Sequence, residues 1–181
     1  TVKFRPNKLV LPGLALAAVV IAAIFLPRLF TPRKGAAVAS DRPTLAVVYF
    51  ENKTGDESLD SWSLSLQDLL ITDLSQSKFL RALSADKMYS ILRRLHLDET
   101  TRYSTDDLVK VADEGAAEYT ISGSFIKAGP QLLVRATLQK PRAEDVIGNI
   151  SVECPTMNEI QAKVDDLTRQ IKAALNLTEQ Q

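Results

Sequence analysis

The spacing of apolar residues changes near residue 119, and this change restricts the fold more than any other feature. Between residues 59 and 115, apolar side chains recur mainly at three- and four-residue steps, the period of one helix face. Between residues 119 and 153 they alternate with polar residues, the period of a strand with one buried face. A continuous apolar run, "TLAVVYF" at 44–50, is typical of a strand buried on both faces. These patterns predict an α/β protein.

The predicted order of elements is βαβααβββα, which gives a mixed sheet of about five strands with packed helices. The first strand–helix–strand unit implies a parallel pair joined by a right-handed crossover, and the later strands are joined by short turns that favour antiparallel pairing. The predicted strands are 44–50, 79–84, 119–127, 131–139 and 146–153. Helices are predicted after Leu59, Ser84 and Ser104, and a last one begins with a capping box of Thr156 and Glu159.

An uncharged run, Leu9–Leu26, approaches the length that crosses a bilayer, and the residues up to 30 can extend it. We expect a transmembrane helix at 9–30, a cytoplasmic flank at 1–8, a linker at 31–42, an α/β domain at 43–177 and the start of a connection at 178–181. A cleavable signal peptide ending at Ala39 is the alternative, but cations lie between the apolar run and that site. The chain begins with Thr1, as an excerpt of a longer protein would.

Charge is divided unevenly along the chain, although the total is zero. Residues 1–42 hold seven basic residues and one acid, a net charge of +6, and the remainder holds fifteen basic and twenty-one acidic residues, a net charge of −6. Because phosphate neutralisation needs a basic face, the acidic part is not expected to bind nucleic acid.

The segment "YFENKTGDESLDSW" at 49–62 has the position of a phosphate-binding loop, between a strand and a helix. A phosphate loop needs several glycines and a lysine at the helix start, whereas this segment has Gly55 alone and four acids that would repel phosphate. The acids do not have the spacing of a calcium-binding EF-hand loop, and Asp56 and Asp60 suit a helix N-terminus. We therefore expect a capped turn, with an ion site as the alternative.

Other candidate groups carry no recognisable chemistry. Paired acids on the predicted helices lie opposite the apolar stripe and are expected on the solvated surface; they are Asp68, Asp73, Asp106, Asp107, Asp113 and Glu114. Cys154, the single cysteine, is expected to be buried, and His96 to lie at a helix end. We expect no catalytic residue, no cofactor and no metal site, and the sequence leaves a small-molecule ligand unknown.

Two separated motifs resemble the family of domains similar to the amino-terminal part of TolB and to the flagellar outer-membrane protein FlgO. In the first, an apolar strand leads into a loop with a small residue and a glycine; in the second, a Gly-Ala pair, an aromatic and a Gly-Ser pair precede a hairpin with glycine at its tip. Tyr49 departs from the family, which commonly has proline there. The matching positions, which are structural rather than catalytic, are Phe50, Asn52, Thr54, Gly55, Gly115, Ala116, Tyr119, Gly123, Ser124 and Gly129.

The resemblance implies a bacterial membrane protein in which such a domain follows an effector and a membrane helix and precedes tetratricopeptide repeats. The effector is often a Ser/Thr protein kinase, a winged-helix domain or a cyclase. The leading hypothesis is a non-catalytic, extracytoplasmic sensory or protein-interaction module of an inner-membrane signalling protein, held by one anchor and binding a protein partner or itself. The alternative is a structural or assembly module of the envelope without signalling, and a third hypothesis is a phosphate-handling enzyme.

Overall fold

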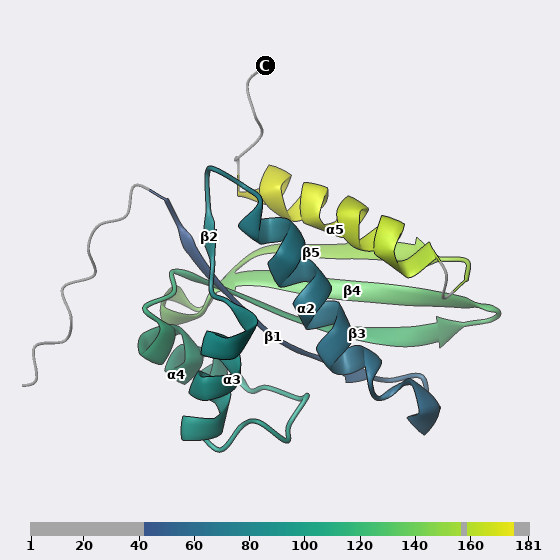
Figure 1. Cartoon of the computed structure of the whole chain (residues 1–181), viewed down its shortest axis with the longest axis horizontal. Helices are drawn as coiled ribbons and strands as arrows, with labels where there is room; N and C mark the ends of the chain where they lie inside the picture. The colour runs from purple at the N-terminus through teal and green to yellow at the C-terminus, as the bar shows by residue number, and fades with distance from the viewer. Residues whose placement is uncertain (1–41, 157–158, 176–181) are drawn as a thin grey trace, which may run out of the picture. The chain divides into compact units, whose positions relative to one another are not determined.

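A computed structural model describes residues 42–156 and 159–175, and in this part of the chain four α-helices accompany one five-stranded sheet (Figure 1). The strands are β1 (Thr44–Asn52), β2 (Arg81–Ala82), β3 (Tyr119–Ala128), β4 (Gln131–Lys140) and β5 (Asp145–Cys154). The α-helices are α2 (Trp62–Ser75), α3 (Ala85–Arg94), α4 (Thr105–Gly115) and α5 (Ile160–Ala174), and two 3-10 turns are η1 (Glu57–Leu59) and η2 (Pro141–Ala143).

The sheet is mixed, as the sequence predicts. Its strand order is β2-β1-β3-β4-β5, with β1 parallel to both β2 and β3 and with β3, β4 and β5 antiparallel in succession. The second strand is much shorter than the predicted 79–84, because only Arg81 and Ala82 pair with β1. The chain then turns into α3, since the Ser84 side chain accepts a hydrogen bond from the backbone of Lys87.

Two helices, α2 and α5, lie against one face of the sheet (Figure 1). Val47 on β1 and Ile121 on β3 are paired, face these helices and are fully buried. Their neighbours Ala46 and Thr120, which face the other way, are also fully buried, because α4 packs on β1 and β3. The parallel half of the sheet therefore has helices on both faces, whereas the strands beyond β3 are covered on one.

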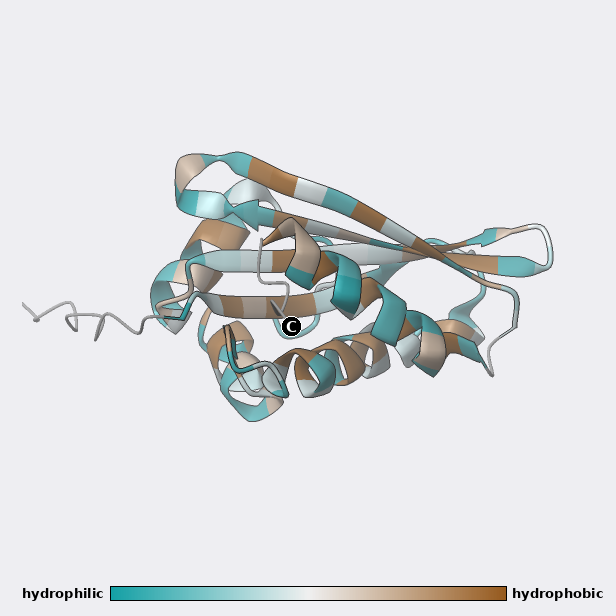
Figure 2. Cartoon of the chain, turned by 90° about the horizontal axis from the view of Figure 1, so that it is seen from above, coloured by the Kyte–Doolittle hydropathy of each residue, from teal (hydrophilic) through white to brown (hydrophobic). Residues whose placement is uncertain are grey.

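Hydropathy follows this arrangement along the strands (Figure 2). In β4 the residues that face α2 and α5 are buried, and the alternate residues between them are half-buried or exposed. The period of two that predicts a strand with one buried face is thus confirmed for the antiparallel half.

Identifiable residues fix both ends of α4. Ser104 and Asp107 form a reciprocal capping box at its start, where the sequence predicts that a helix begins. Gly115 is its last residue, and Ala116, with φ of 50°, is the left-handed residue that follows. Gly115 is buried, and a Cβ there would lie 2.6 Å from Cδ1 of Leu83, so this glycine is needed for packing.

The predicted start of the last helix is also wrong. Helix α5 begins at Ile160, and its N-cap residue Glu159 makes no capping hydrogen bond through its side chain. Thr156 Oγ1 instead donates to Glu159 Oε1 at 3.0 Å. The two residues expected to form the capping box therefore bond to each other before the helix begins.

Within residues 42–156 and 159–175 no helix is long and apolar enough to span a bilayer. The predicted transmembrane helix at 9–30 lies outside the described residues, as do the flank at 1–8, the linker up to residue 41 and the connection at 178–181.

Candidate functional site

The uncovered face of β3, β4 and β5 forms a shallow hollow of about 460 Å³. Its floor consists of two cross-strand rows of polar residues. One row is Ser122, Thr137 and Asn149, and the other is Ser124, Arg135 and Ser151. Glu51 and Lys53 at the end of β1 line its rim. The hollow exists because helices cover this face only at the β1 end of the sheet.

The floor of the hollow offers hydrogen bonds and a positive charge. The Thr137 hydroxyl donates to Asn149 Oδ1 at 2.9 Å. The amide nitrogen of Asn149 makes no hydrogen bond to the described residues and can donate to a ligand. The Arg135 side chain is exposed and makes no ion pair or hydrogen bond with other residues of 42–156 and 159–175. A guanidinium group in this position can bind a carboxylate through two parallel hydrogen bonds.

Glu51 is the only carboxylate of the described residues that lines the hollow, and two cations hold it. Lys53 Nζ lies 3.0 Å from Glu51 Oε2, and Arg102 donates to Oε1 through Nε at 2.9 Å and Nη2 at 2.6 Å. Burial opposes ionisation of this carboxyl, but the hydrogen bonds from Lys53 and Arg102 outweigh it and keep the pKa of Glu51 below its usual value. Glu51 is therefore an ionised structural group and is poorly suited to act as a general acid.

The 49–62 segment forms a turn held by Asn52. The amide nitrogen of Asn52 donates to the Asp56 carbonyl at 2.9 Å and to Asp60 Oδ1 at 2.6 Å. Its amide oxygen accepts from the Thr54 backbone and hydroxyl. Asp56 caps η1 by accepting from the backbone of Ser58, and its hydrogen bonds to Ser58 and Lys127 lower the pKa of its carboxyl. These contacts are those of a capped turn, in which Asp56 and Asp60 take part.

The signature positions lie in two places in the fold. Phe50, Asn52, Thr54 and Gly55 form the end of β1 and the turn, where Gly55 has φ of +76°. The others lie along the path from α4 to the β3–β4 hairpin; they are Gly115, Ala116, Tyr119, Gly123, Ser124 and Gly129. The two groups meet where Phe50 pairs with Gly123 and its ring fills the space that a side chain at Gly123 would take. Of these positions, Ser124 contributes a polar side chain to the hollow.

The paired acids of the helices do not enter the hollow. Asp107 caps α4, and hydrogen bonds from Ser104 lower the pKa of its carboxyl, whereas Asp113 binds Arg142 and Glu114 binds Arg94. Asp68, Asp73 and Asp106 lie on helix surfaces, and burial raises the pKa of Asp68 and Asp73, with further contributions from Asp86 and Asp165 respectively. In the part of the chain that the structure describes, no group of His, Cys, Asp or Glu is arranged to hold a metal ion.

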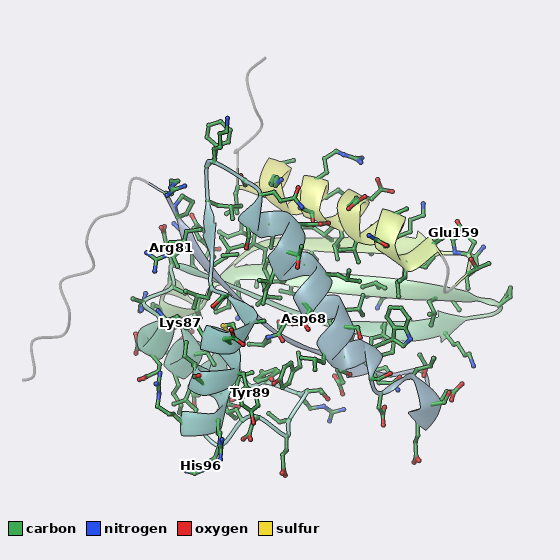
Figure 3. All side chains as sticks on the ribbon, in the orientation of Figure 1. Asp68, Arg81, Lys87, Tyr89, His96 and Glu159 are labelled. Carbon is green, nitrogen blue, oxygen red and sulfur yellow. The ribbon has the colours of Figure 1, made fainter. Side chains whose placement is uncertain are left out.

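The cysteine and the histidine lie where the sequence places them. Cys154 is fully buried at the end of β5, and burial raises the pKa of its thiol. His96 is exposed just beyond α3 with φ of 57°, at the end of the helix away from the sheet (Figure 3). Neither residue lines the hollow.

The comparisons with known proteins identify the fold of this chain but not its family. No family model and no curated sequence matches the chain. Among solved structures, LpoB from E. coli matches with a TM-score of 0.51 at 14% identity, over 63% of this chain and 57% of that one. The lipoprotein GNA1162 from Neisseria meningitidis matches with a TM-score of 0.50 at 12% identity, over 73% of this chain and 98% of that one. This chain therefore shares the fold of LpoB and GNA1162.

TolB from Acinetobacter baumannii also matches, with a TM-score of 0.45 at 15% identity, over 76% of this chain and 28% of that one. The α/β fold expected from the resemblance is confirmed through the two matches above. Membership of the TolB-like and FlgO-like family, and the role of the signature residues in it, stay predictions.

Sequence reasoning found the turn and missed the hollow. The polar residues of its floor lie on three strands and are spread over about thirty positions of the sequence, so no single segment contains them as a motif. The sequence does contain a signal, because a polar residue stands at every second position in each of the three strands. These residues are Ser122 and Ser124, Arg135 and Thr137, and Asn149 and Ser151. Reading these residues as one surface requires the register of the strands.

Proposed function

We propose that residues 43–177 form a non-catalytic, extracytoplasmic protein-binding module of a bacterial envelope protein. This is the assembly alternative of the sequence analysis, and it is favoured over signalling because a chain with the same fold is named a lipoprotein. The signalling hypothesis, with its kinase and tetratricopeptide repeats, has no support in the described residues or in the matched structures.

The observation that carries this proposal is the uncovered polar face of β3, β4 and β5. The domain beyond residue 42 has a net charge of −6, yet this face presents Arg135 without an ion pair among the described residues. Lys53 and Arg102 add two cations beside Glu51, the one acid among the described residues that lines the hollow. A local positive region on an acidic domain favours a partner that brings a carboxylate. The proposed occupant is therefore a protein surface with an Asp or Glu side chain that binds Arg135.

The residue types of the hollow favour binding over catalysis. Among the residues that the structure describes, no base is paired with its hydroxyl and amide groups, and its carboxylate is held by two cations. Nucleophilic catalysis needs a base within hydrogen-bond reach of the nucleophile. The 49–62 turn has four acids and a single glycine, which disfavours a phosphate-handling enzyme. Calorimetric titration with Mg-ATP should therefore give no binding heat.

The proposal places the module outside the cytoplasm, tied to the inner membrane by the predicted helix at 9–30. A reporter enzyme that is active only outside the cytoplasm, fused after Gln181, should be active. Activity only of a cytoplasmic reporter at the same position would overturn the proposed location and leave the fold unaffected.

A photo-crosslinking amino acid tests the binding face directly. Placed at Thr137 in the full chain and expressed in its own cells, it should give a discrete protein adduct. The matched control is Gln170, which is exposed on α5 at the opposite face of the sheet and should give none. Arg135→Glu should abolish the Thr137 adduct while the protein stays folded. Equal adducts at both positions, or an adduct indifferent to Arg135→Glu, would contradict the proposal.

A further inference from the structure

Strand β5 ends the sheet, and the direction of its backbone groups follows from one hydrogen bond on the other side of β3. The backbone N–H of Lys53 donates to the carbonyl of Phe125 at 2.9 Å, so the polar groups of Phe125 point toward β1. Backbone groups of successive strand residues point in opposite directions, and those of Ser124 therefore point toward β4. Arg135, the partner of Ser124, points back toward β3.

The same alternation of backbone N–H and C=O groups gives their direction in β5, the strand at the edge of the sheet. Since Arg135 points toward β3, its neighbour Ala136 points toward β5 and pairs there with Ile150. Ile150 thus points into the sheet. Asn149, Ser151 and Glu153 consequently direct their N–H and C=O groups away from the sheet, and none of them forms a further backbone hydrogen bond among the described residues.

This free edge is short and bounded at both ends. At one end the register between β4 and β5 shifts, so that Ile147 bulges out of the ladder between Val146 and Gly148. At the other end stands Pro155, which has no N–H to donate. Between these limits lie seven residues with Ser151 at their centre. Strand β5 contains no proline and no lysine, the residues that commonly protect such an edge from pairing.

We infer that this edge pairs with the same edge of a second copy of the chain, antiparallel, about a two-fold axis at Ser151. In this register Ser151 lies opposite Ser151 of the second copy, and Asn149 lies opposite Glu153. All three outward residues of both copies then form hydrogen-bonded pairs, and two sheets become one. A register shifted in either direction must pair an outward residue with the bulge at Ile147 or with Pro155, so it forms fewer backbone bonds.

The side chains agree with this register. Asn149 would lie beside Glu153 of the second copy, where its amide can donate to the carboxylate. On the opposite face Ile150 would lie beside Val152, an apolar cross-strand pair. A register centred on Asn149 would instead place Asp145 opposite Glu153, and like charges in opposite positions destabilise a sheet. The repulsion between Asp145 and Glu153 therefore favours the two-fold axis at Ser151, as the backbone hydrogen bonds do.

The pairing is independent of the partner proposed for the hollow. The side chains of Asn149 and Ser151 stay on the uncovered face when their backbones pair, so the two hollows would join across the axis. Arg135 lies one strand inward and is not needed for the pairing.

Cysteine crosslinking of the full chain in detergent tests the register, in a background where Cys154→Ala removes the native thiol. Opposite residues of a hydrogen-bonded pair have Cα atoms about 5.5 Å apart, within the range of a disulfide. Ser151→Cys should therefore form a dimer under mild oxidation. Asn149→Cys is the control, because the two copies of this residue would be offset by about 13 Å along the strands. A mixture of Asn149→Cys and Glu153→Cys chains should again crosslink.

Sedimentation equilibrium tests the backbone contribution. Ser151→Pro removes an outward N–H while leaving the β4 ladder intact, and it should weaken self-association at least about tenfold. Ser151→Ala should leave self-association unchanged, and circular dichroism establishes that both variants are folded. The inference is overturned if the parent chain stays monomeric at all concentrations, if Ser151→Pro associates as the parent does, or if Asn149→Cys crosslinks as well as Ser151→Cys. These results do not depend on the Arg135→Glu test, so either proposal can fail alone.

Discussion

The two halves of the sheet differ in what covers them. In β1, four consecutive residues, Leu45–Val48, are fully buried because helices lie on both faces. In β4, burial alternates, because α2 and α5 cover one face and the other is open. A strand with consecutive apolar residues buries its side chains on both faces of the sheet. A strand that alternates buries one face and exposes polar side chains on the other. The positions available for recognition therefore lie in the antiparallel half.

Strand β3 belongs to both halves and shows where the change occurs. Its first residues lie under α4, where Thr120 is fully buried, and two residues later Ser122 is only half-buried on the uncovered face. Between Ser122 and Ser124 the ring of Phe50 packs over Gly123 on the helix side. This contact joins the core of the parallel half to the floor of the hollow.

The largest predicted effect comes from Gly123→Val. A Cβ at this position would collide with the Phe50 ring and with the Arg135 carbonyl, so we expect a loss of about 3 kcal/mol in the free energy of unfolding. Urea unfolding followed by the fluorescence of Trp62, the single tryptophan, measures it. Gly129→Ala is the control: it has open space but φ of +66°, and should cost about 1 kcal/mol. Equal losses would mean that the close packing of Phe50 on Gly123 adds nothing.

A matched pair of Thr→Val substitutions compares the covered and uncovered regions. The Thr120 hydroxyl is buried without a hydrogen-bond partner among the described residues, so Thr120→Val should raise the free energy of unfolding by about 1 kcal/mol. Thr137→Val on the uncovered face loses the hydrogen bond to Asn149 and should give no gain. The two midpoints of thermal unfolding test this difference, and a gain from Thr137→Val or a loss from Thr120→Val would contradict it.

The smallest effect concerns pH at the rim of the hollow. The pKa of Glu51 is lower in the folded protein than its ordinary value of 4.5, so its contribution to stability is complete above that value and is lost as the pH falls through the folded pKa. Arg102→Gln should weaken this acid dependence by less than about 1 kcal/mol, because the Arg102 side chain is 81% exposed. Urea midpoints at neutral and acidic pH measure it.

The control for this pH effect is Lys87→Gln, which removes an exposed cation on α3 that forms no ion pair among the described residues (Figure 3). It should leave the acid dependence unchanged. If Lys87→Gln and Arg102→Gln shift the acid midpoint equally, net charge and not the contact with Glu51 is responsible.

The error in the second predicted strand comes from packing. The apolar residues Leu80 and Leu83 suggest a longer strand, and both are buried, but they contribute to the core beside a ladder of only two residues. Leu83 packs against Gly115, the last residue of α4, where a side chain would not fit. The apolar residue type predicts burial correctly, but tertiary packing decides which of these residues pair as a strand.

The capped turn at 49–62 was predictable because its contacts are local. Asn52 reaches Thr54, Asp56 and Asp60, all within eight residues. The hollow and the free edge of β5 could not be predicted, because each depends on the register of strands that are distant along the chain.

The α/β class, the mixed sheet and the capped turn follow from the order of the residues, because periodicity and short-range hydrogen bonds are properties of neighbouring residues. Three further features depend on how distant strands pair and which helices cover them. These are the uncovered face, the place of Arg135 among hydroxyl groups of three strands, and the outward direction of the backbone groups of Asn149, Ser151 and Glu153. Every strand has N–H and C=O groups along both of its edges. Because β5 is the last strand of the sheet, the groups along its outer edge are left without a strand to pair with.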